Sequence, residues 1–292
     1  MVSHSILMLL LPIHTRLLKK GDDLASLLSE STQIVEGDIL VISSKAIATM
    51  EGAAIDLRKI TISKDADKWS KACGRSAAFC QAILDELERL HGKVVGTCPG
   101  ALLTELRPTG LSEGTIFAAN AGLDQSNVED GFAVGWPRDP VESVKKLREA
   151  LYSLSPRGEP ACLQAGTMVR GFGVILSDSC CIPRRRGVTA HALVVSGIDP
   201  LFSEIGNNDL FGKPLRITIE ARADQLATAA NILMGNAGQL IPAVIIRDHG
   251  IPLTRFESWV PGIEPEEDLF QGIFSIDNSF TFPTMARFPH AP

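Results

Sequence analysis

The segment Gly173 to Gly187, GVILSDSCCIPRRRG, limits the possible fold more than any other part of the chain. Its apolar run Val174–Leu176 is short, which predicts a buried strand that breaks at Ser177-Asp178-Ser179. A turn with three arginines, Arg184 to Arg186, follows. A carboxylate at a strand end can hold a divalent metal, and guanidinium groups can hold phosphate or carboxylate oxygens. The alternative is a strand end followed by a solvated basic turn, because clustered charges also occur in structural ion-pair networks.

Polar residues also follow two other predicted strands. Ile39–Ile42 is followed by Ser43, Ser44 and Lys45, and Thr115–Ala119 is followed by Asn120, Asp124 and Asn127. In α/β proteins, ligands bind beyond the carboxyl ends of strands. If the three ends converge, they bring together a lysine, carboxylates, amides and hydroxyls. That set suits a nucleoside triphosphate with one or two Mg²⁺ or Mn²⁺ ions, because carboxylates bind metals and cations bind phosphate.

The remaining patterns predict an α/β protein. The longest helical pattern runs from Asp65 to His91, and Asp139 is the predicted N-cap of a helix that begins at Pro140. Ser155–Pro160 is a polar break and a predicted lobe boundary. The other predicted elements are a short helix capped by Asp22, a helix Glu220–Met234 closed by Gly235, and the strands Ile6–Ile13, Gly187–Gly197, Arg216–Ile219 and Pro242–Arg247.

Composition and missing motifs argue against several classes of protein. The net charge of −6 argues against a nucleic-acid binder. The longest apolar run, Ile6–Ile13, is too short to span a membrane and lacks the flanks of a signal peptide. Six cysteines without a C-x-x-C pair indicate reduced thiols in a cytoplasmic protein and no zinc site. Neither phosphate-loop nor G-x-S-x-G motifs occur, and we interpret His14 and His191 as packed or surface residues.

Several motifs, taken in order, resemble those of the coenzyme F420-0:γ-glutamyl ligase family. They extend over roughly Gly21 to Phe270, and their combination is specific although one alone would be weak. The matching segments are GDDL (Gly21–Leu24), GDILVISSK (Gly37–Lys45) followed by Glu51-Gly52, ANAGLDQSNV (Ala119–Val128), VILSDS (Val174–Ser179), DLFGKPLRIT (Asp209–Thr218), ARADQLATAANILMG (Ala221–Gly235) and EEDLF (Glu266–Phe270).

The resemblance implies a homodimer of an unusual two-lobed α/β fold, with residues 1–274 as the ligase-like catalytic unit. Residues 275–292 are expected to be an irregular tail because they contain three prolines and no periodic pattern. The resemblance also implies an amide-forming ligase. Such an enzyme activates an acceptor carboxylate as an acyl phosphate with GTP or ATP, and the amine of L-glutamate then attacks. The implied acceptor is the deazaflavin precursor F420-0 or a folate. The implied cofactors are Mg²⁺ or Mn²⁺, as two ions, with room for K⁺.

Residue by residue, the resemblance implies that Asp124 and Asp178 bind the metals, with Ser179 beside them. Arg185 is expected to stabilise charge on the transferring phosphoryl group. The expected nucleotide contacts are Ser43, Ser44, Lys45, Asn127, Met234 and Gly235.

Three departures from the family pattern affect the acceptor and the nucleotide. The turn after Ser179 lacks the family's aromatic residue, Thr15-Arg16-Leu17 replaces G-[LI]-P, and Asn236 replaces a lysine. The arginine-rich turn instead resembles a divergent branch whose expected acceptor is a folate. The changes at Asn236 and at Thr15–Leu17 support a second hypothesis, a nucleotide-binding regulator or scaffold without ligase activity, but the retention of Asp124 and Asp178 argues against it.

Overall fold

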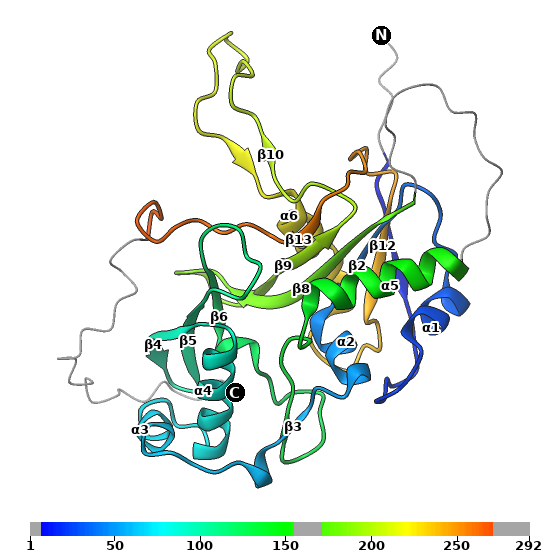
Figure 1. Ribbon diagram of the computed structural model, residues 1–292. Coiled ribbons are helices and arrows are strands. Elements are labelled where there is room, and N and C mark those ends of the chain that lie inside the picture. The colour runs from blue at the N-terminus through cyan, green and yellow to red at the C-terminus, as the bar shows by residue number, and fades with distance from the viewer. Residues whose placement is uncertain (1–6, 155–170, 271–292) are drawn as a thin grey trace.

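A mixed six-stranded sheet forms the centre of the protein in the computed structural model, which describes residues 7–154 and 171–270 (Figure 1). Its strands lie in the order β1 (Leu9–Ile13), β12 (Ala243–Arg247), β2 (Ile39–Ser43), β8 (Gly173–Cys181), β9 (Val188–Ser196) and β13 (Glu257–Trp259). Only β2 and β8 pair in parallel; the other neighbours are antiparallel. The predicted α/β class is therefore confirmed as a mixed α/β fold.

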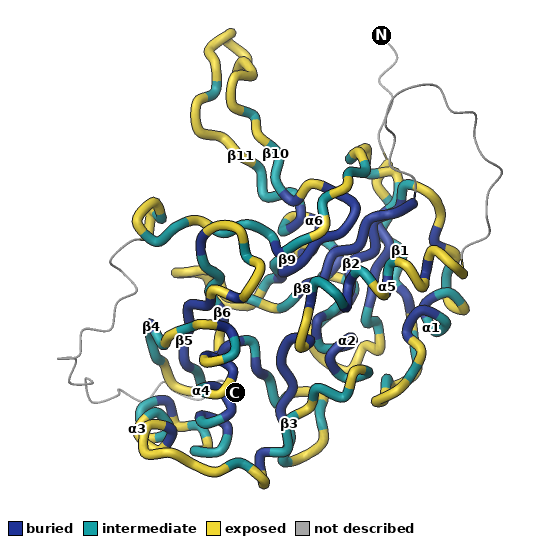
Figure 2. The backbone as a smooth tube through the Cα atoms, viewed as in Figure 1, coloured by how far each residue is buried: buried dark blue, intermediate teal, exposed yellow. Residues whose placement is uncertain are grey.

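Helices cover both faces of this sheet, which explains why its central strands are apolar almost without interruption. Leu40, Ile42 and Leu176 pack with α1 (Leu24–Ser31) and α5 (Pro140–Leu154) on one face. Val41 and Ile175 pack with α6 (Arg222–Met234) on the other. The buried sheet is the dark blue centre of Figure 2. The predicted caps of two helices are confirmed: Asp139 accepts the Glu142 N–H, and Gly235 ends α6 with a φ of 64°.

A smaller unit packs beside this sheet. It contains the antiparallel strands β4 (Lys93–Cys98), β5 (Ala101–Leu106) and β6 (Ile116–Ala119), with α3 (Lys64–Cys73) and α4 (Ala77–Arg89). The prediction of one helix over Asp65–His91 is wrong. Gly74 turns the chain with a φ of 74°, and Ser76 starts a new helix by accepting the Phe79 N–H.

Other predictions require correction. The strand at Val174 does not break at Ser177 but continues to Cys181, because the antiparallel ladder with β9 includes Asp178 opposite His191. Asp23, not Asp22, caps α1, since Asp22 pairs with Arg16. The helix α2 (Ser44–Glu51) was not predicted. The Ser155–Pro160 break and the tail from Ser275 lie outside the described residues.

Short elements complete the fold. These are β3 (Ile55–Asp56), η1 (Leu57–Lys59), η2 (Asn120–Gly122), β7 (Phe132–Ala133), β10 (Phe202–Ser203) and β11 (Ile219–Glu220). The last two strands form the base of a long arm that extends away from the body (Figure 1). Of the strand predicted at Arg216–Ile219, only Ile219 lies in a strand, β11. Within the described ranges, no helix has both the length and the apolar composition that crossing a membrane requires.

Candidate active site

The parallel pairing of β2 and β8 brings two of the predicted strand ends together. Ser43 lies opposite Ser177, so Lys45, in the first turn of α2, and Asp178, one residue further along β8, face the same region. The third strand end arrives from the smaller unit. After β6, η2 turns the chain at Ala121, which has a φ of 54°, and leads it to Asp124. The three polar segments that were predicted to converge therefore do meet, although Ser177–Ser179 lies within β8 and not at its end.

A cavity of about 540 Å³ lies where these ends meet. Eight of the predicted site residues line it: Ser43, Lys45, Asp124, Asn127, Asp178, Ser179, Met234 and Gly235. Two do not. Ser44 is 2% exposed and lies behind the cavity wall as the first residue of α2. Arg185 lies in the exposed turn between β8 and β9, although Cys181 and Val188 at the ends of that turn do line the cavity.

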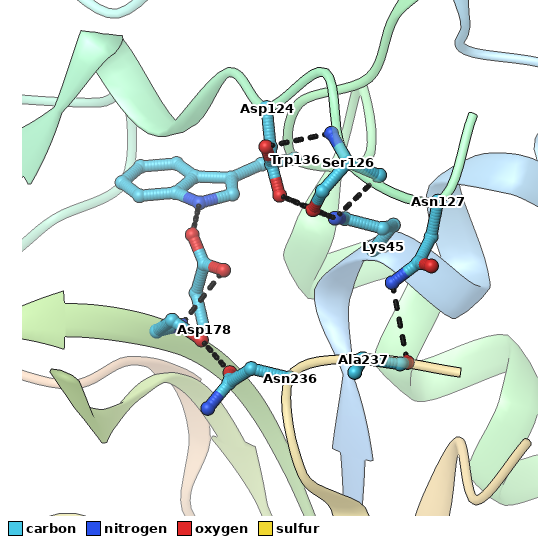
Figure 3. A network of polar contacts seen from close by, with 9 residues as sticks. Lys45, Asp124, Ser126, Asn127, Trp136, Asp178, Asn236 and Ala237 are labelled. Carbon is cyan, nitrogen blue, oxygen red and sulfur yellow. Dashed lines mark hydrogen bonds and ion pairs between the residues drawn. The ribbon is translucent and has the colours of Figure 1, made fainter. Parts of the chain in front are cut away.

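Lys45 and Asp124 form an ion pair inside the cavity (Figure 3). Lys45 Nζ donates to Asp124 Oδ2 at 2.5 Å and to the carbonyl and hydroxyl oxygens of Ser126 at 2.9 and 3.0 Å. Ser126 donates its backbone N–H and its hydroxyl to the same carboxylate. Burial raises the pKa of Asp124, but the hydrogen bonds from Lys45 and Ser126 outweigh it and hold that pKa below its usual range. Asp124 is therefore a carboxylate at neutral pH.

Asp178 has a different environment: its carboxylate forms no ion pair with a lysine or arginine among residues 7–154 and 171–270. Trp136 Nε1 donates to its Oδ2 at 2.6 Å, and the Ser179 backbone N–H donates to its Oδ1 at 2.8 Å (Figure 3). Burial raises the pKa of Asp178 to about 6, and the nearby Asp124 charge acts in the same direction, while these two hydrogen bonds lower it. The cavity thus contains two acids with separated pKa values, a feature of functional sites.

The raised pKa of Asp178 predicts a pH-dependent cost to stability. Between the ordinary pKa of 3.8 and about 6, the native protein binds more protons than the unfolded chain, so the free energy of unfolding falls as pH rises. Asp178→Asn removes this titration. We expect its stability relative to the wild type to increase from about pH 4 to about pH 7, as measured by urea unfolding. An identical difference at both pH values would contradict the prediction.

The loop after α6 closes one side of the cavity by bonding to both acid-bearing segments. Asn127 Nδ2 donates to the Ala237 carbonyl at 3.3 Å, and Ser179 Oγ donates to Asn236 Oδ1 at 2.7 Å. Asn236, at the position where the resemblance implies a lysine, therefore contributes an amide hydrogen-bonded to Ser179.

Two site residues were not identified from the sequence. Ser126 could have been, because a serine two residues after Asp124 can form this kind of local turn. Trp136 could not, because it is 42 positions from Asp178 in the chain and its ring looks like any core aromatic.

The donor set of the cavity fits a hard divalent cation whose remaining ligands come from water and substrate. Carboxylates of Asp124 and Asp178 and the hydroxyl of Ser179 are oxygen donors of the kind that Mg²⁺ and Mn²⁺ prefer. No group of three His, Cys, Asp or Glu residues suited to a metal occurs within residues 7–154 and 171–270. The described residues therefore do not supply a complete set of protein ligands for a metal. Mg²⁺ does not require one, because it usually binds through one or two carboxylates plus phosphate oxygens.

The chain is similar in sequence to a family of ligases over most of its length. Residues 12–248 match the sequence model of the F420-0:Gamma-glutamyl ligase family. The coenzyme F420:L-glutamate ligase of Methanopyrus kandleri is 37% identical over 242 residues, which cover 83% of this chain and 87% of that protein. The ligase of the same name from Archaeoglobus fulgidus is 36% identical, with 79% and 83% covered. That of Methanococcus maripaludis is 30% identical, with 93% and 100% covered.

Proposed function

This chain belongs to the F420-0:γ-glutamyl ligase family, and on that premise we propose that it is an enzyme that joins L-glutamate to an acceptor carboxylate by an amide bond. The observation that supports this most is the cavity itself. Lys45, Asp124 and Asp178 come from three separate segments and line one space with the nucleotide-contact candidates Asn127 and Gly235. An ordinary structural ion pair would not need a cavity of this size beside it.

In the proposed reaction, an acceptor carboxylate oxygen attacks the γ-phosphorus of GTP or ATP, and the nucleoside diphosphate leaves. The amine of L-glutamate then attacks the acyl carbon, loses a proton, and displaces inorganic phosphate to leave an amide. Neither step requires a nucleophile from the protein. The protein must hold the reactants in line and neutralise the phosphoryl charge, and such positioning is worth several kcal/mol.

Lys45 is the side chain best placed to neutralise that charge. Its side chain is 25% exposed and is held by Asp124 and Ser126, so the ammonium is oriented before substrate arrives. Asn127 and the loop around Gly235, which bond to one another through Ala237, would enclose the nucleotide. Asp124, Asp178 and Ser179 would hold Mg²⁺ or Mn²⁺, which supplies further charge neutralisation when bound. We further propose that two such divalent ions bind, with K⁺ as an additional ion.

The arginine turn is the proposed contact for the acceptor. Arg184, Arg185 and Arg186 make no side-chain hydrogen bond or ion pair with any residue that the structure describes. Arg184 also has a φ of 61°, which is uncommon for a residue other than glycine. Three cations in the turn beside the cavity wall suit an acceptor with carboxylates or a phosphate. F420-0 and folates both meet this description, and Arg185 can reach the phosphoryl group only if the turn moves toward the cavity.

We also propose that the enzyme is a homodimer in which the arm packs on a second copy, with the two sheets as the lobes of each subunit. The arm has several apolar residues in water: Leu210 is fully exposed, and Phe211 and Ile217 are 88% and 87% exposed. A set of this kind usually marks a protein contact. The family resemblance supports a second copy as the partner.

The direct test is a ligation assay read by mass. Purified protein, Mg²⁺ or Mn²⁺, L-glutamate and either GTP or ATP are incubated with F420-0 or with reduced folates. We expect a gain of one or more glutamyl units on one acceptor, with release of nucleoside diphosphate. Nucleotide and metal binding without mass gain on either acceptor would instead favour the regulator or scaffold.

A further inference from the structure

Trp136 holds the carboxylate of Asp178 from the protein side. Its Nε1–H donates to Oδ2 at 2.6 Å, and the ring is 2% exposed, whereas Asp178 lines the cavity (Figure 3). A carboxylate has about four acceptor positions. The indole and the Ser179 N–H use one on each oxygen, which leaves the others for the cavity.

The indole is itself fixed in place by its neighbours. A Cβ atom at Gly122, where φ is +78°, would lie 2.6 Å from Nε1 and Cε2 of Trp136, so the glycine permits the contact. The ring of Trp259 also packs against Trp136, with 6.0 Å between the ring centroids and 54° between the ring planes. Trp259 donates its own indole N–H to the Thr109 carbonyl. A buried ring fixed between such neighbours can impose a direction on the carboxylate.

The segment of Trp136 is also tied to the other acid. Val134, two residues before it, exchanges both backbone hydrogen bonds with Asp124, at 2.8 and 2.9 Å. One short segment therefore contacts the backbone of Asp124 and the side chain of Asp178. It is a continuous connection between the two carboxylates, of which Asp178 belongs to β8 and Asp124 to the loop after η2.

We propose that Trp136 is a positioning residue that sets the Asp178 carboxylate relative to Asp124 for binding of a divalent cation. This inference rests on the metal site of the proposed function. Donors that hydrogen-bond to a metal-binding side chain fix its orientation, and removing one typically weakens metal affinity about 10- to 100-fold.

Trp136→Phe tests this because it keeps an aromatic ring and removes only the N–H donor and part of the ring. We expect the Kd for Mn²⁺, measured by electron paramagnetic resonance with a non-hydrolysable nucleotide bound, to rise about 10- to 100-fold. The Kd for the nucleotide without metal should change less than about twofold. Trp69→Phe is the control: it makes the same tryptophan-to-phenylalanine change in α3, at a residue that does not line the cavity, and should bind Mn²⁺ like the wild type.

A second measurement leaves Trp136 in place. The chain has three tryptophans, Trp69, Trp136 and Trp259, so 5-fluorotryptophan labelling gives three ¹⁹F signals. Asp178→Asn should shift the Trp136 signal and leave that of Trp69, and Mn²⁺ should broaden Trp136 more than Trp69.

The two proposals fail in different ways. Weakened Mn²⁺ binding in Trp136→Phe without any ligation by the wild type would preserve this inference and reject the function. Unchanged Mn²⁺ affinity in that variant, no Mn²⁺ binding by the wild type, or an unshifted Trp136 signal in Asp178→Asn would overturn the inference.

Discussion

Asp178→Asn is expected to lower the rate of ligation on the order of 10³-fold or more while the protein remains folded. The substitution keeps the size of the side chain but removes the negative charge that would hold a cation beside the phosphoryl group. The fold should tolerate it because burial already disfavours the charged form of Asp178. The measurement is the rate of glutamyl transfer at saturating nucleotide, together with the circular dichroism of the variant.

Asp224→Asn is the matched control for this experiment. Burial raises the pKa of Asp224 too, and its Oδ1 accepts a backbone N–H, from Ala192, at 2.8 Å. It belongs to α6 and does not line the cavity. We expect that variant to retain most of the activity. Near-normal turnover by Asp178→Asn, or equal losses of activity in both variants, would show that Asp178 has no specific role in the active site.

Replacing Leu210 and Phe211 together with aspartate is expected to convert the proposed dimer into monomers. Both side chains are almost entirely exposed in the single chain, so the substitutions cost little in the isolated fold. In a dimer they would place two charges per subunit in an apolar contact, at a cost of several kcal/mol. In the wild-type dimer, burial of these side chains would remove an apolar surface that favours aggregation. Sedimentation equilibrium measures the molecular mass of both proteins and so shows whether the dimer is lost.

Ile62→Asp controls for a general effect of charge on an exposed apolar residue, since Ile62 is 51% exposed and precedes α3, away from the arm. It should leave the dimer intact. A wild-type protein that sediments as a monomer, or an arm variant that still sediments as a dimer, would contradict this assembly.

Much of the site could be predicted because its chemistry is local in the chain. The run Ile39–Ile42 with Lys45, and the run Val174–Leu176 with Asp178, predict strands that deliver polar groups to one region. The parallel register that places Ser43 opposite Ser177 then brings these groups together. Helix ends were equally readable where a cap acts within a few residues, as at Asp139 and Gly235.

The failures have physical causes at longer range. Apolar spacing continues through Gly74, so periodicity alone could not show that α3 and α4 are separate helices. The polar run after Leu176 looked like the end of a strand, but the pairing partners that extend β8 to Cys181 lie in β9. Strand length is decided by such partners as much as by composition.

By itself, the sequence determined the apolar runs of the central strands, the identities of the acids and of Lys45, and the membership of a family. Only the tertiary structure decided the protonation chemistry of the two acids. Asp124 contacts Lys45 from 79 positions away, and Asp178 accepts the indole N–H of Trp136 from 42 positions away. The pKa of a carboxyl depends on its burial and on the charges around it. Those neighbours come from distant segments, so folding makes two equal residues into unequal acids.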